Sequence, residues 1–383
     1  MTAKKYDWLV VGAGLTGTVI AERLASVLDK KVLVIDRRSH PAGNIFDGRD
    51  DDGILYHHYG PHIFHTNSEM VVSYLSRFTE WYDYEHRVRG MINGRLVPIP
   101  FNLISLQICF DAARAGRLQE ALIRRYGYGA KVPILSMMKN TEGELRDLAQ
   151  FVFDNVFFGY TLKQWGMPPE MLAPSVTARV PVHISYDDRY FNDSFQRMPV
   201  GGYTNMVKRI LSHENIDVEL GTDWASVRDS SFYKKIVFTG PIDEFFRCEF
   251  GALPYRSLDF VFQTYAQSRH QPVAQVNYPN EHAFTRITEM GHMTHEWEGK
   301  TKVAIEYPTA YTPGISLPYY PIPQDDNQNL YNRYRDFAAK EAPDVIFCGR
   351  LGNYQYYNMD QAVAKALTIF QKQICGVGEK ISV

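Results

Sequence analysis

The sequence predicts an α/β protein built on a discontinuous Rossmann-type dinucleotide-binding domain. The first observation is a short apolar run, Trp8 to Val11, followed by glycines at the spacing GxGxxG and by a second apolar run that ends at Asp36. The second is that strand-like apolar runs return at 235–238 and 344–349, far along a chain of 383 residues. The third is a largely helical pattern at 101–180, which interrupts that domain. A chain of this length can hold two or three domains with cores of their own.

The glycine-rich stretch at the start of the chain predicts where a dinucleotide binds. In a strand–GxGxxG–helix turn, the first glycine allows the tight bend, the second lets the backbone approach a pyrophosphate, and the third lets helix and strand pack closely. The free N–H groups at the start of the helix then point at the phosphates. The residues of this turn expected to contact the cofactor are Gly12, Gly14, Leu15, Thr16 and Gly17. The alternative, a glycine-rich surface turn, requires no ligand and stays open.

Asp36 closes the second strand about 20 residues beyond the glycines, where a carboxylate accepts hydrogen bonds from an adenosine ribose. Arg37 and the turn Gly43-Asn44 follow, a pattern by which many flavoproteins bring backbone N–H groups back to the FAD pyrophosphate. A second interpretation assigns Arg37 and Arg38 to the 2′-phosphate of NADP, but a carboxylate at position 36 would repel that phosphate. We therefore expect FAD, and the chain lacks the second GxGxxG that a flavin reductase usually carries for NAD(P)H.

Composition narrows the range of partners and compartments. The net charge of −2 gives no general attraction to nucleic acid or to an anionic membrane surface, and no run reaches the roughly 18 apolar residues of a membrane span. The four cysteines are scattered without a CxxC pair, which favours reduced thiols and a cytoplasmic location. His62 and His65 have a spacing that could suit a metal, but Gly60-Pro61 breaks any helix there and no third ligand follows. We therefore expect no metal.

Hydrophobic periodicity assigns the remaining elements. Helices are expected at 69–81, 118–126, 141–158, 204–211 (with Thr204 as the N-terminal cap) and 359–374. A hairpin is expected at 84–100, and strands at 218–220, 258–264, 274–278 and 302–307. From these elements we predict an FAD-binding domain of residues 1–84, 213–245 and 340–383, a helical insertion with a mobile lid at 101–180, and an antiparallel sheet domain for the substrate at 85–100, 181–212 and 246–339.

Eight further motifs stand in order along the chain and are more specific than the glycine turn. They are YGPHIFHT (59–66), GYTLKQWG (159–166), ARVPV (178–182), DDRYF (187–191), P-x-GGYT (199–204), FTRITE (284–289), PYYPI (318–322) and GRLGNYQYYNMD (349–360). Together they make the chain resemble the bacterial UDP-galactopyranose mutases over nearly its whole length, from Val10 to about Ala366.

The resemblance implies an unusual use of FAD. Members of that family interconvert UDP-galactopyranose and UDP-galactofuranose: N5 of the reduced flavin attacks C1 of the sugar, UDP leaves, and it returns after the ring has reclosed, with no net redox change. The flavin must first be reduced by an external donor such as NAD(P)H. A homodimer is usual in the family. We therefore expect a cytoplasmic isomerase that serves the biosynthesis of cell-surface polysaccharide.

The resemblance also implies roles for individual residues. Arg179 and Arg286 match the two arginines that hold the diphosphate, a task suited to guanidinium groups. His62 matches a histidine that supports the flavin. The other residues expected at the substrate are Tyr160 against the uracil, Trp165 in the lid, the diphosphate tyrosines Tyr190, Tyr320 and Tyr356, and Phe157, Thr161, His86 and Asn358. The other residues expected at the flavin are Ile63, Gly240, Arg350, Met359 and Asp360, where the start of a helix favours the anionic reduced ring.

Three residues depart from the family pattern. His86 stands where an Asn is common, Asn358 where many members carry Asp, and Ala42 where a GGN turn has its first Gly. The first two lie near the expected substrate pocket, so a mutase of an N-acetylated, 6-deoxy or dTDP-linked sugar stays open. Three other classes also stay open: a flavin amine oxidase or desaturase, a non-catalytic nucleotide-sugar binding protein, and an NADP dehydrogenase.

Overall fold

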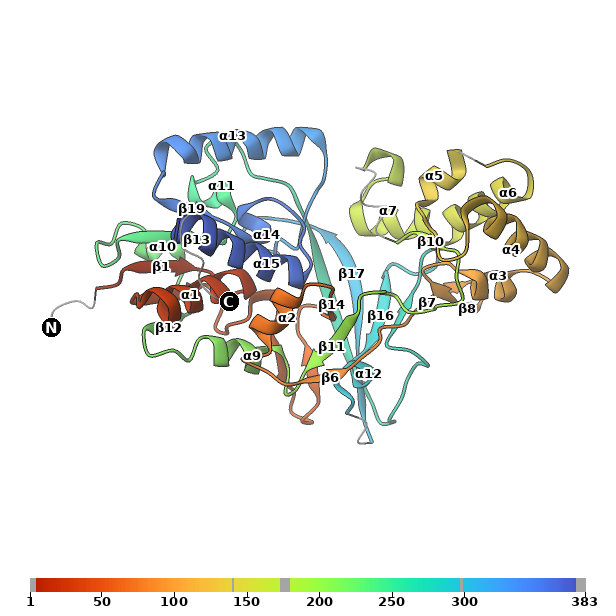
Figure 1. Ribbon diagram of the computed structural model, residues 1–383, viewed down its shortest axis with the longest axis horizontal. Helices are drawn as coiled ribbons and strands as arrows, with labels where there is room; N and C mark the ends of the chain where they lie inside the picture. Colours follow the sequence, from red (N-terminus) through yellow and green to blue (C-terminus); the bar gives the residue numbers. More distant parts are fainter. Residues whose placement is uncertain (1–4, 140, 173–179, 297–298, 377–383) are drawn as a thin grey trace. The chain divides into compact units, whose positions relative to one another are not determined.

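The structure is a computed structural model that describes residues 5–139, 141–172, 180–296 and 299–376 (Figure 1). The chain forms two compact units. The parallel-sheet unit comprises residues 1–83, 193–254 and 325–383, and the mixed-sheet unit comprises residues 84–192 and 255–324. Each unit contains a large sheet of its own. Among the described residues, no helix combines the length and the apolar composition that crossing a membrane requires.

The parallel-sheet unit is centred on a five-stranded sheet in the order β12-β2-β1-β13-β19. Its strands are β1 (Trp8–Val11), β2 (Val32–Asp36), β12 (Ile216–Leu220), β13 (Lys235–Phe238) and β19 (Val345–Phe347), and every pairing is parallel. The residues of β1 are all buried, as expected of apolar strands whose sheet is covered on both faces. The strands predicted for the nucleotide domain are therefore confirmed.

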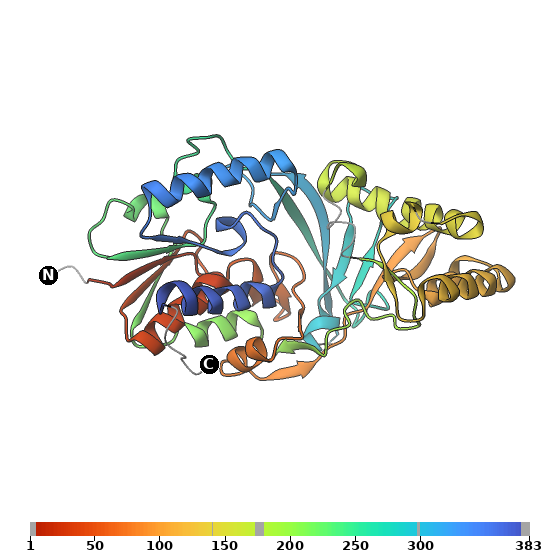
Figure 2. The ribbon, with the colours of Figure 1, turned by 45° about the horizontal axis from the view of Figure 1, so that its top comes forward.

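Helices cover this sheet on both sides (Figure 2). On one side α1 (Leu15–Leu28) packs against β1, β2 and α15 (Met359–Ile369). On the other side lies α13 (Asp325–Glu341), which packs against α11 (Ile242–Phe245). Short helices α10 (Trp224–Val227) and α14 (Gly349–Gly352) follow β12 and β19. A π-helical turn, Phe370–Ile374, continues α15, so that the predicted helix at 359–374 is confirmed.

Smaller elements complete the parallel-sheet unit. A three-stranded antiparallel sheet contains β5 (Phe64–Thr66), β11 (Phe195–Pro199) and β6 (Trp81–Asp83), and β3 (Asp47–Arg49) pairs with β4 (Leu55–His57). The helix predicted at 69–81 is wrong in its second half, because α2 spans only Glu69–Leu75. Beyond it, Trp81 enters β6 and pairs with Pro199 of β11. Here strand pairing with a distant segment overrides the local helical pattern.

Thr204 is not the cap of its helix. Helix α9 spans Tyr203–Ile210 and is preceded by Gly202, and the Asp47 carboxylate accepts the backbone N–H groups of Tyr203 at 2.6 Å and of Thr204 at 2.8 Å. A Cβ on Gly202 would lie 2.5 Å from Asp47 Oδ2. The glycine of the P-x-GGYT motif therefore makes room for a capping carboxylate that comes from a residue more than 150 positions earlier.

The mixed-sheet unit contains a seven-stranded sheet in the order β18-β14-β17-β16-β15-β7-β8. Its strands are β7 (Val88–Ile92), β8 (Arg95–Ile99), β14 (Tyr255–Tyr265), β15 (Gln275–Asn277), β16 (Arg286–Glu289), β17 (Thr301–Ala310) and β18 (Tyr320–Pro321). All pairs are antiparallel except β15 with β7, which is parallel. The predicted hairpin is confirmed: Asn93 and Gly94 form its tip with φ values of 48° and 73°.

Helices occupy the segment between the hairpin and residue 172. They are α3 (Leu103–Cys109), α4 (Ala112–Tyr126), α5 (Ile134–Lys139), α6 (Gly143–Val152), a π-helix (Phe153–Phe158), α7 (Gly159–Trp165) and a 3-10 turn (Pro169–Met171). They share one buried core with the hairpin, in which Val88 and Val97 lie with Leu118, Leu148 and Val152. The helical segment thus belongs to the same compact unit as the sheet.

The observed division of the chain differs from the predicted three domains in two ways. Residues 193–212, 246–254 and 325–339 were predicted in the sheet domain but fall in the parallel-sheet unit. The reason is that β11 pairs with β5 and β6, α9 packs on α1, and α13 packs on α11. The helical insertion and the sheet form one unit because they share a core. Periodicity predicts single elements, whereas a domain boundary depends on which elements pack together.

Candidate functional site

In the turn between β1 and α1, Gly12 and Gly17 have no room for a side chain, whereas Gly14 has. Gly12 has φ +107°, and a Cβ there would lie 2.0 Å from Thr239 Oγ1. A Cβ on Gly17 would lie 2.1 Å from the carbonyl oxygen of Gly12, and one on Gly14 would be 3.9 Å from Gly43 Cα. Helix α1 begins at Leu15, and no side chain caps it. Its first N–H groups are therefore available to an anion.

Asp36 is fixed at the end of β2 by the backbone. Its Oδ2 accepts the N–H of Ala13 and its Oδ1 the N–H of Arg38, both at 2.9 Å. Arg37 points to the surface and forms a 3.4 Å ion pair with Glu244, in which both side chains are exposed. Arg38 instead lies over the ring of Tyr59, 4.5 Å from its centroid, and donates to Asn44 Oδ1 at 2.8 Å. Among the described residues nothing accepts a hydrogen bond from its buried Nη1.

The segment around His62 lies in the same unit. The backbone N–H of His62 donates to His57 Nδ1 at 3.0 Å, and His62 Nδ1 lies 2.9 Å from the carbonyl oxygen of Gly60. Burial lowers the pKa of His57, so its ring is the neutral acceptor that this bond requires. His65 is bound to Asp193 at 2.7 Å. Sequence reasoning missed His57, whose only signal was its place in a run of four histidines.

The start of α15 carries a second unpaired buried atom. Asp360 Oδ2 accepts the Thr66 hydroxyl at 3.0 Å, and its Oδ1 is buried without a hydrogen-bond partner among the described residues. Asn358 caps the helix, and Met359 is its first residue. Arg350 donates to the carbonyl of Tyr357 at 2.8 Å and lies 4.7 Å from the ring centroid of Tyr356. A helix start of this kind favours negative charge nearby.

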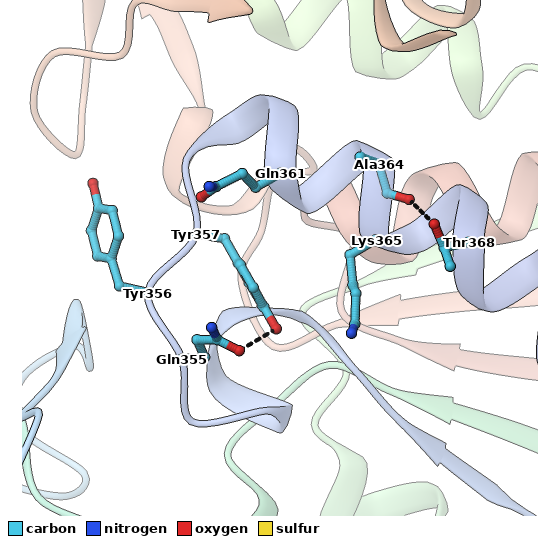
Figure 3. Close-up of a pocket in the computed structure, with 7 residues that line it drawn as sticks. All are labelled: Gln355, Tyr356, Tyr357, Gln361, Ala364, Lys365 and Thr368. Carbon is cyan, nitrogen blue, oxygen red and sulfur yellow. Dashed lines mark hydrogen bonds between the residues drawn. The ribbon is translucent and has the colours of Figure 1, made fainter. Parts of the chain in front are cut away.

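A shallow hollow of about 350 Å³ lies beside α15. It is lined by Gln355, Tyr356, Tyr357, Gln361, Ala364, Lys365 and Thr368. Figure 3 shows Tyr356 pointing away from Tyr357, whose hydroxyl donates to Gln355 Oε1 at 2.9 Å. Of the other predicted cofactor residues in this unit, Ile63 is half-buried, and a Cβ on Gly240 would lie 3.0 Å from the Phe238 ring.

Arg286 is the charged centre of a cluster in the mixed-sheet unit. It pairs across the sheet with Glu306 on β17 and with Asn277 on β15. Its Nε and Nη2 donate to Glu306 Oε2 at 2.9 and 2.5 Å, and the carboxyl side chain of Glu306 is only 1 % exposed. Nη1 of Arg286 has no partner among the described residues. Although burial alone lowers the pKa of Arg286, the Glu306 charge raises it well above its ordinary value, so the guanidinium is permanently charged.

Three predicted tyrosines lie at or next to this pair: Tyr160 and Tyr320 are within electrostatic range of Arg286, and Tyr190 is within range of Tyr160. Burial raises the pKa of Tyr160, and Arg286, Glu306, Tyr190 and Tyr320 all lie within electrostatic range of its hydroxyl. The rings of Trp165 and Tyr320 are 6.1 Å apart. The structure thus brings together residues from α7, the 187–191 segment, β16, β17 and β18. Sequence reasoning missed Glu306, although its register opposite Arg286 in alternating strands is the signal that could have found it.

The remaining predicted substrate residues differ in their surroundings. His86 is buried, bonded to the Tyr84 hydroxyl at 2.9 Å and stacked on Phe191, and its carbonyl accepts the N–H of Tyr190. Phe157 and Thr161 are also buried. Tyr356 and Asn358 belong to the parallel-sheet unit. Arg179 lies outside the described residues.

Comparison with known proteins places these features in a family. A family model described as UDP-galactopyranose mutase matches residues 155–356, and one described as an NAD(P)-binding Rossmann-like domain matches residues 10–78. A Klebsiella pneumoniae protein described as a probable UDP-galactopyranose mutase is 38% identical over 94% of this chain and 92% of its own. The chain belongs to the UDP-galactopyranose mutase family. The resemblance drawn from eight sequence motifs is therefore confirmed, and the chain is an enzyme of the mutase class.

Two further relatives bear on substrate and fold. The dTDP-fucopyranose mutase of Escherichia coli is 34% identical over 96% of this chain and 98% of its own. The crystal structure of a reduced UDP-galactopyranose mutase superimposes with a TM-score of 0.73, covering 98% of this chain and 96% of that one at 15% identity. At that identity the match shows the fold, and it confirms the predicted α/β class with its Rossmann-type domain.

Proposed function

We propose that this mutase interconverts UDP-galactopyranose and UDP-galactofuranose with reduced FAD. The observation that carries the proposal is the Arg286 cluster: a permanently charged guanidinium with an open Nη1, within electrostatic range of the phenols of Tyr160 and Tyr320, with Tyr190 next to Tyr160. Guanidinium and phenol groups are the donors that a sugar-linked diphosphate requires. The name of the Klebsiella relative supports UDP-galactose as the substrate.

The parallel-sheet unit fits FAD. The crowded glycine turn leaves only backbone beside the start of α1, where a pyrophosphate can approach. The Asp36 carboxylate suits the ribose, and the unpaired Arg38 Nη1 and Asp360 Oδ1 are polar atoms that a bound cofactor could satisfy. Arg38 thus joins the predicted set, whereas Arg37 faces Glu244 at the surface. The description of the solved relative as reduced supports a redox-active cofactor.

When bound, reduced FAD supplies a nucleophilic N5 for C1 of the sugar, so that UDP leaves and returns without net redox change. The task of this chain is then to stabilise a departing diphosphate. Arg286 does so through Nη1 while Glu306 holds its other two nitrogens in place, and Arg179 is predicted to add a second positive charge. The hydroxyls of Tyr190 and Tyr320 donate to the same oxygens. Tyr160, Thr161 and Trp165 bind the uridine end, with Tyr160 against the uracil. His62, Ile63, Gly240, Arg350, Met359 and Asp360 are predicted to hold the isoalloxazine.

The test is to purify the protein, record its visible spectrum, and incubate it with UDP-galactofuranose before and after reduction with dithionite. We expect a yellow protein that forms UDP-galactopyranose only when reduced. A colourless protein that binds UDP would contradict the FAD assignment, and net oxidation of the sugar would contradict the mutase reaction.

The dTDP-fucopyranose mutase relative favours a second candidate, the same chemistry on a dTDP-linked 6-deoxy sugar. The reduced enzyme should therefore also be given dTDP-fucofuranose. If this substrate turns over and UDP-galactofuranose does not, the mutase class holds and the UDP-galactose assignment fails.

Location and assembly complete the proposal. In the described part of the chain, Cys109, Cys248, Cys348 and Cys375 form no disulfide, which supports a reducing compartment such as the cytoplasm. An external reductant such as NAD(P)H would have to reach the flavin. A homodimer is our expectation for the assembly, and sedimentation of the purified protein measures it.

A further inference from the structure

Helix α7 carries three of the residues proposed to bind the uridine. It also carries Lys163, which has no part in the proposed reaction but makes a distinctive set of contacts. Lys163 Nζ lies within hydrogen-bond distance of four backbone carbonyl oxygens, which share its three N–H groups: those of Tyr278, of Phe284 at 3.0 Å, of Glu281 at 3.3 Å and of His282 at 3.4 Å. In the described part of the chain no carboxylate pairs with it. An ammonium surrounded by carbonyl oxygens of a single loop is held as a bound metal cation would be.

The loop that supplies these carbonyls, residues 278–284, is folded tightly. It is closed by the N–H of Tyr278, which donates to the carbonyl of Thr285 at 2.8 Å. Inside the loop the rings of His282 and Phe284 stack at 4.7 Å and 7°. His282 has φ +65°, a left-handed conformation that costs energy for any residue other than glycine. Converging carbonyl dipoles and a strained residue make this loop conformation costly, and a cation among the carbonyls offsets part of that cost.

The same loop also contacts the first residue of α7. A Cβ on Gly159 would lie 2.5 Å from the carbonyl oxygen of Pro279 and 2.7 Å from Asn280 Oδ1, so the backbone of the helix packs directly against the loop. At the other end of the helix, Arg256 of β14 donates to the carbonyls of Gln164 at 2.9 Å and of Lys163 at 3.2 Å. A cation at a helix C-terminus stabilises it. Contacts with neighbouring segments therefore hold helix α7 at its first residue, at Lys163 and at its C-terminal end.

We propose that Lys163 is a positioning residue. Its ammonium group takes the place of a bound cation and holds the 278–284 loop against α7, and this contact fixes the positions of Tyr160, Thr161 and Trp165. This inference rests on the proposed function, in which those three residues bind the uridine. Burial lowers the pKa of Lys163 to about 8, which leaves the side chain charged at neutral pH.

The first test compares Lys163→Met with Lys139→Met, which removes an exposed lysine from α5 in the same unit. In amide hydrogen exchange we expect residues 159–166 and 278–284 to exchange faster in Lys163→Met only. Isothermal titration should show UDP bound about tenfold more weakly, the loss expected for hydrogen bonds from a charged group. KM for the sugar nucleotide should rise more than kcat falls, and FAD content should stay unchanged.

The second test removes the side chain in Lys163→Ala and adds ammonium chloride or, at equal ionic strength, tetramethylammonium chloride. Ammonium should restore exchange protection in the 278–284 loop, whereas the larger cation should not. Unchanged exchange in Lys163→Met, or equal effects of the two salts on Lys163→Ala, would overturn the inference. If the wild-type protein itself binds no UDP, the proposed function fails, while the exchange comparison still decides whether Lys163 ties the loop to the helix.

Discussion

The dinucleotide turn and the Arg286 cluster differ in the groups that form them: backbone in the turn and side chains in the cluster. The turn uses backbone from a few consecutive residues, and its requirement is the absence of side chains at Gly12 and Gly17. The cluster uses side chains from Tyr160, Arg286 and Glu306, which are far apart in the sequence. Its requirement is charge balance, because a buried carboxylate without a cation is costly. A backbone site is therefore disrupted by added atoms, and a side-chain site by a removed charge.

The largest effect is expected from Arg286→Ala. It removes the proposed diphosphate donor, and losing such a donor typically lowers turnover by about 100- to 1,000-fold. It also leaves the Glu306 carboxylate buried without a counter-charge, which should lower the unfolding free energy by about 3–5 kcal/mol. Turnover and urea unfolding measure the two effects.

Two variants separate folding from function at Arg286. Arg286→Met combined with Glu306→Met removes both charges and should recover much of the stability without recovering activity. Arg117→Ala, which breaks an exposed pair with Glu144 in the same unit, should leave the urea unfolding curve nearly unchanged. Wild-type turnover in Arg286→Ala would contradict the diphosphate role.

The second-largest effect is expected from Gly17→Ala, which tests the glycine turn of the dinucleotide site. In Gly17→Ala the new Cβ would lie 2.1 Å from the Gly12 carbonyl oxygen, so the turn must move. We therefore expect the protein to purify with little FAD, measured by the visible absorbance of the flavin. Gly116→Ala in α4 is the matched control, because a Cβ there meets nothing within 4 Å. That variant should keep its FAD and gain about 0.5–1 kcal/mol in stability. Full FAD content in Gly17→Ala would show that the close packing of the turn is not needed.

A smaller effect concerns acid stability of the mixed-sheet unit. Hydrogen bonds from Arg189 lower the pKa of Asp187 from 3.8 to about 2. Since the pKa is lower in the folded state, this pair stabilises the fold above pH 4, and the contribution is lost as the pH falls toward 2. Because both side chains are partly exposed, we expect about 1 kcal/mol. The unfolding free energy of Asp187→Asn, measured in urea, should therefore change less between pH 4 and pH 2 than that of the wild-type protein. The same change in both proteins would contradict this assignment.

The smallest effect on stability is expected from Asn358→Asp. Asn358 and Gln361 form a capping box at the start of α15, and Asp is as good an N-cap as Asn, so the unfolding free energy should change by less than about 0.5 kcal/mol. Any change in the ratio of kcat/KM for UDP-galactofuranose and dTDP-fucofuranose would then reflect substrate recognition. An equal ratio would remove Asn358 from the residues that could decide the sugar.

The sequence predicted correctly those structural features that depend on residues close together in the chain. The strand, glycines and helix of residues 8–28 could be placed because each constraint acts within one turn. The helix expected at 69–81 and the Thr204 cap were wrong because β11 and Asp47, which decide them, are distant in the sequence. Arg37 and Arg38 are adjacent, and only the fold shows that Arg38 is the one that turns inward onto Tyr59.

The sequence by itself determined the fold class, the dinucleotide turn and the family, because these follow from local spacing and from motifs in order. The tertiary structure decided which charge balances Arg286, which residue caps α9, and which loop surrounds Lys163. These contacts join positions that no local pattern connects. Their energies come from burial and charge pairing, which exist only after distant strands and helices have packed together.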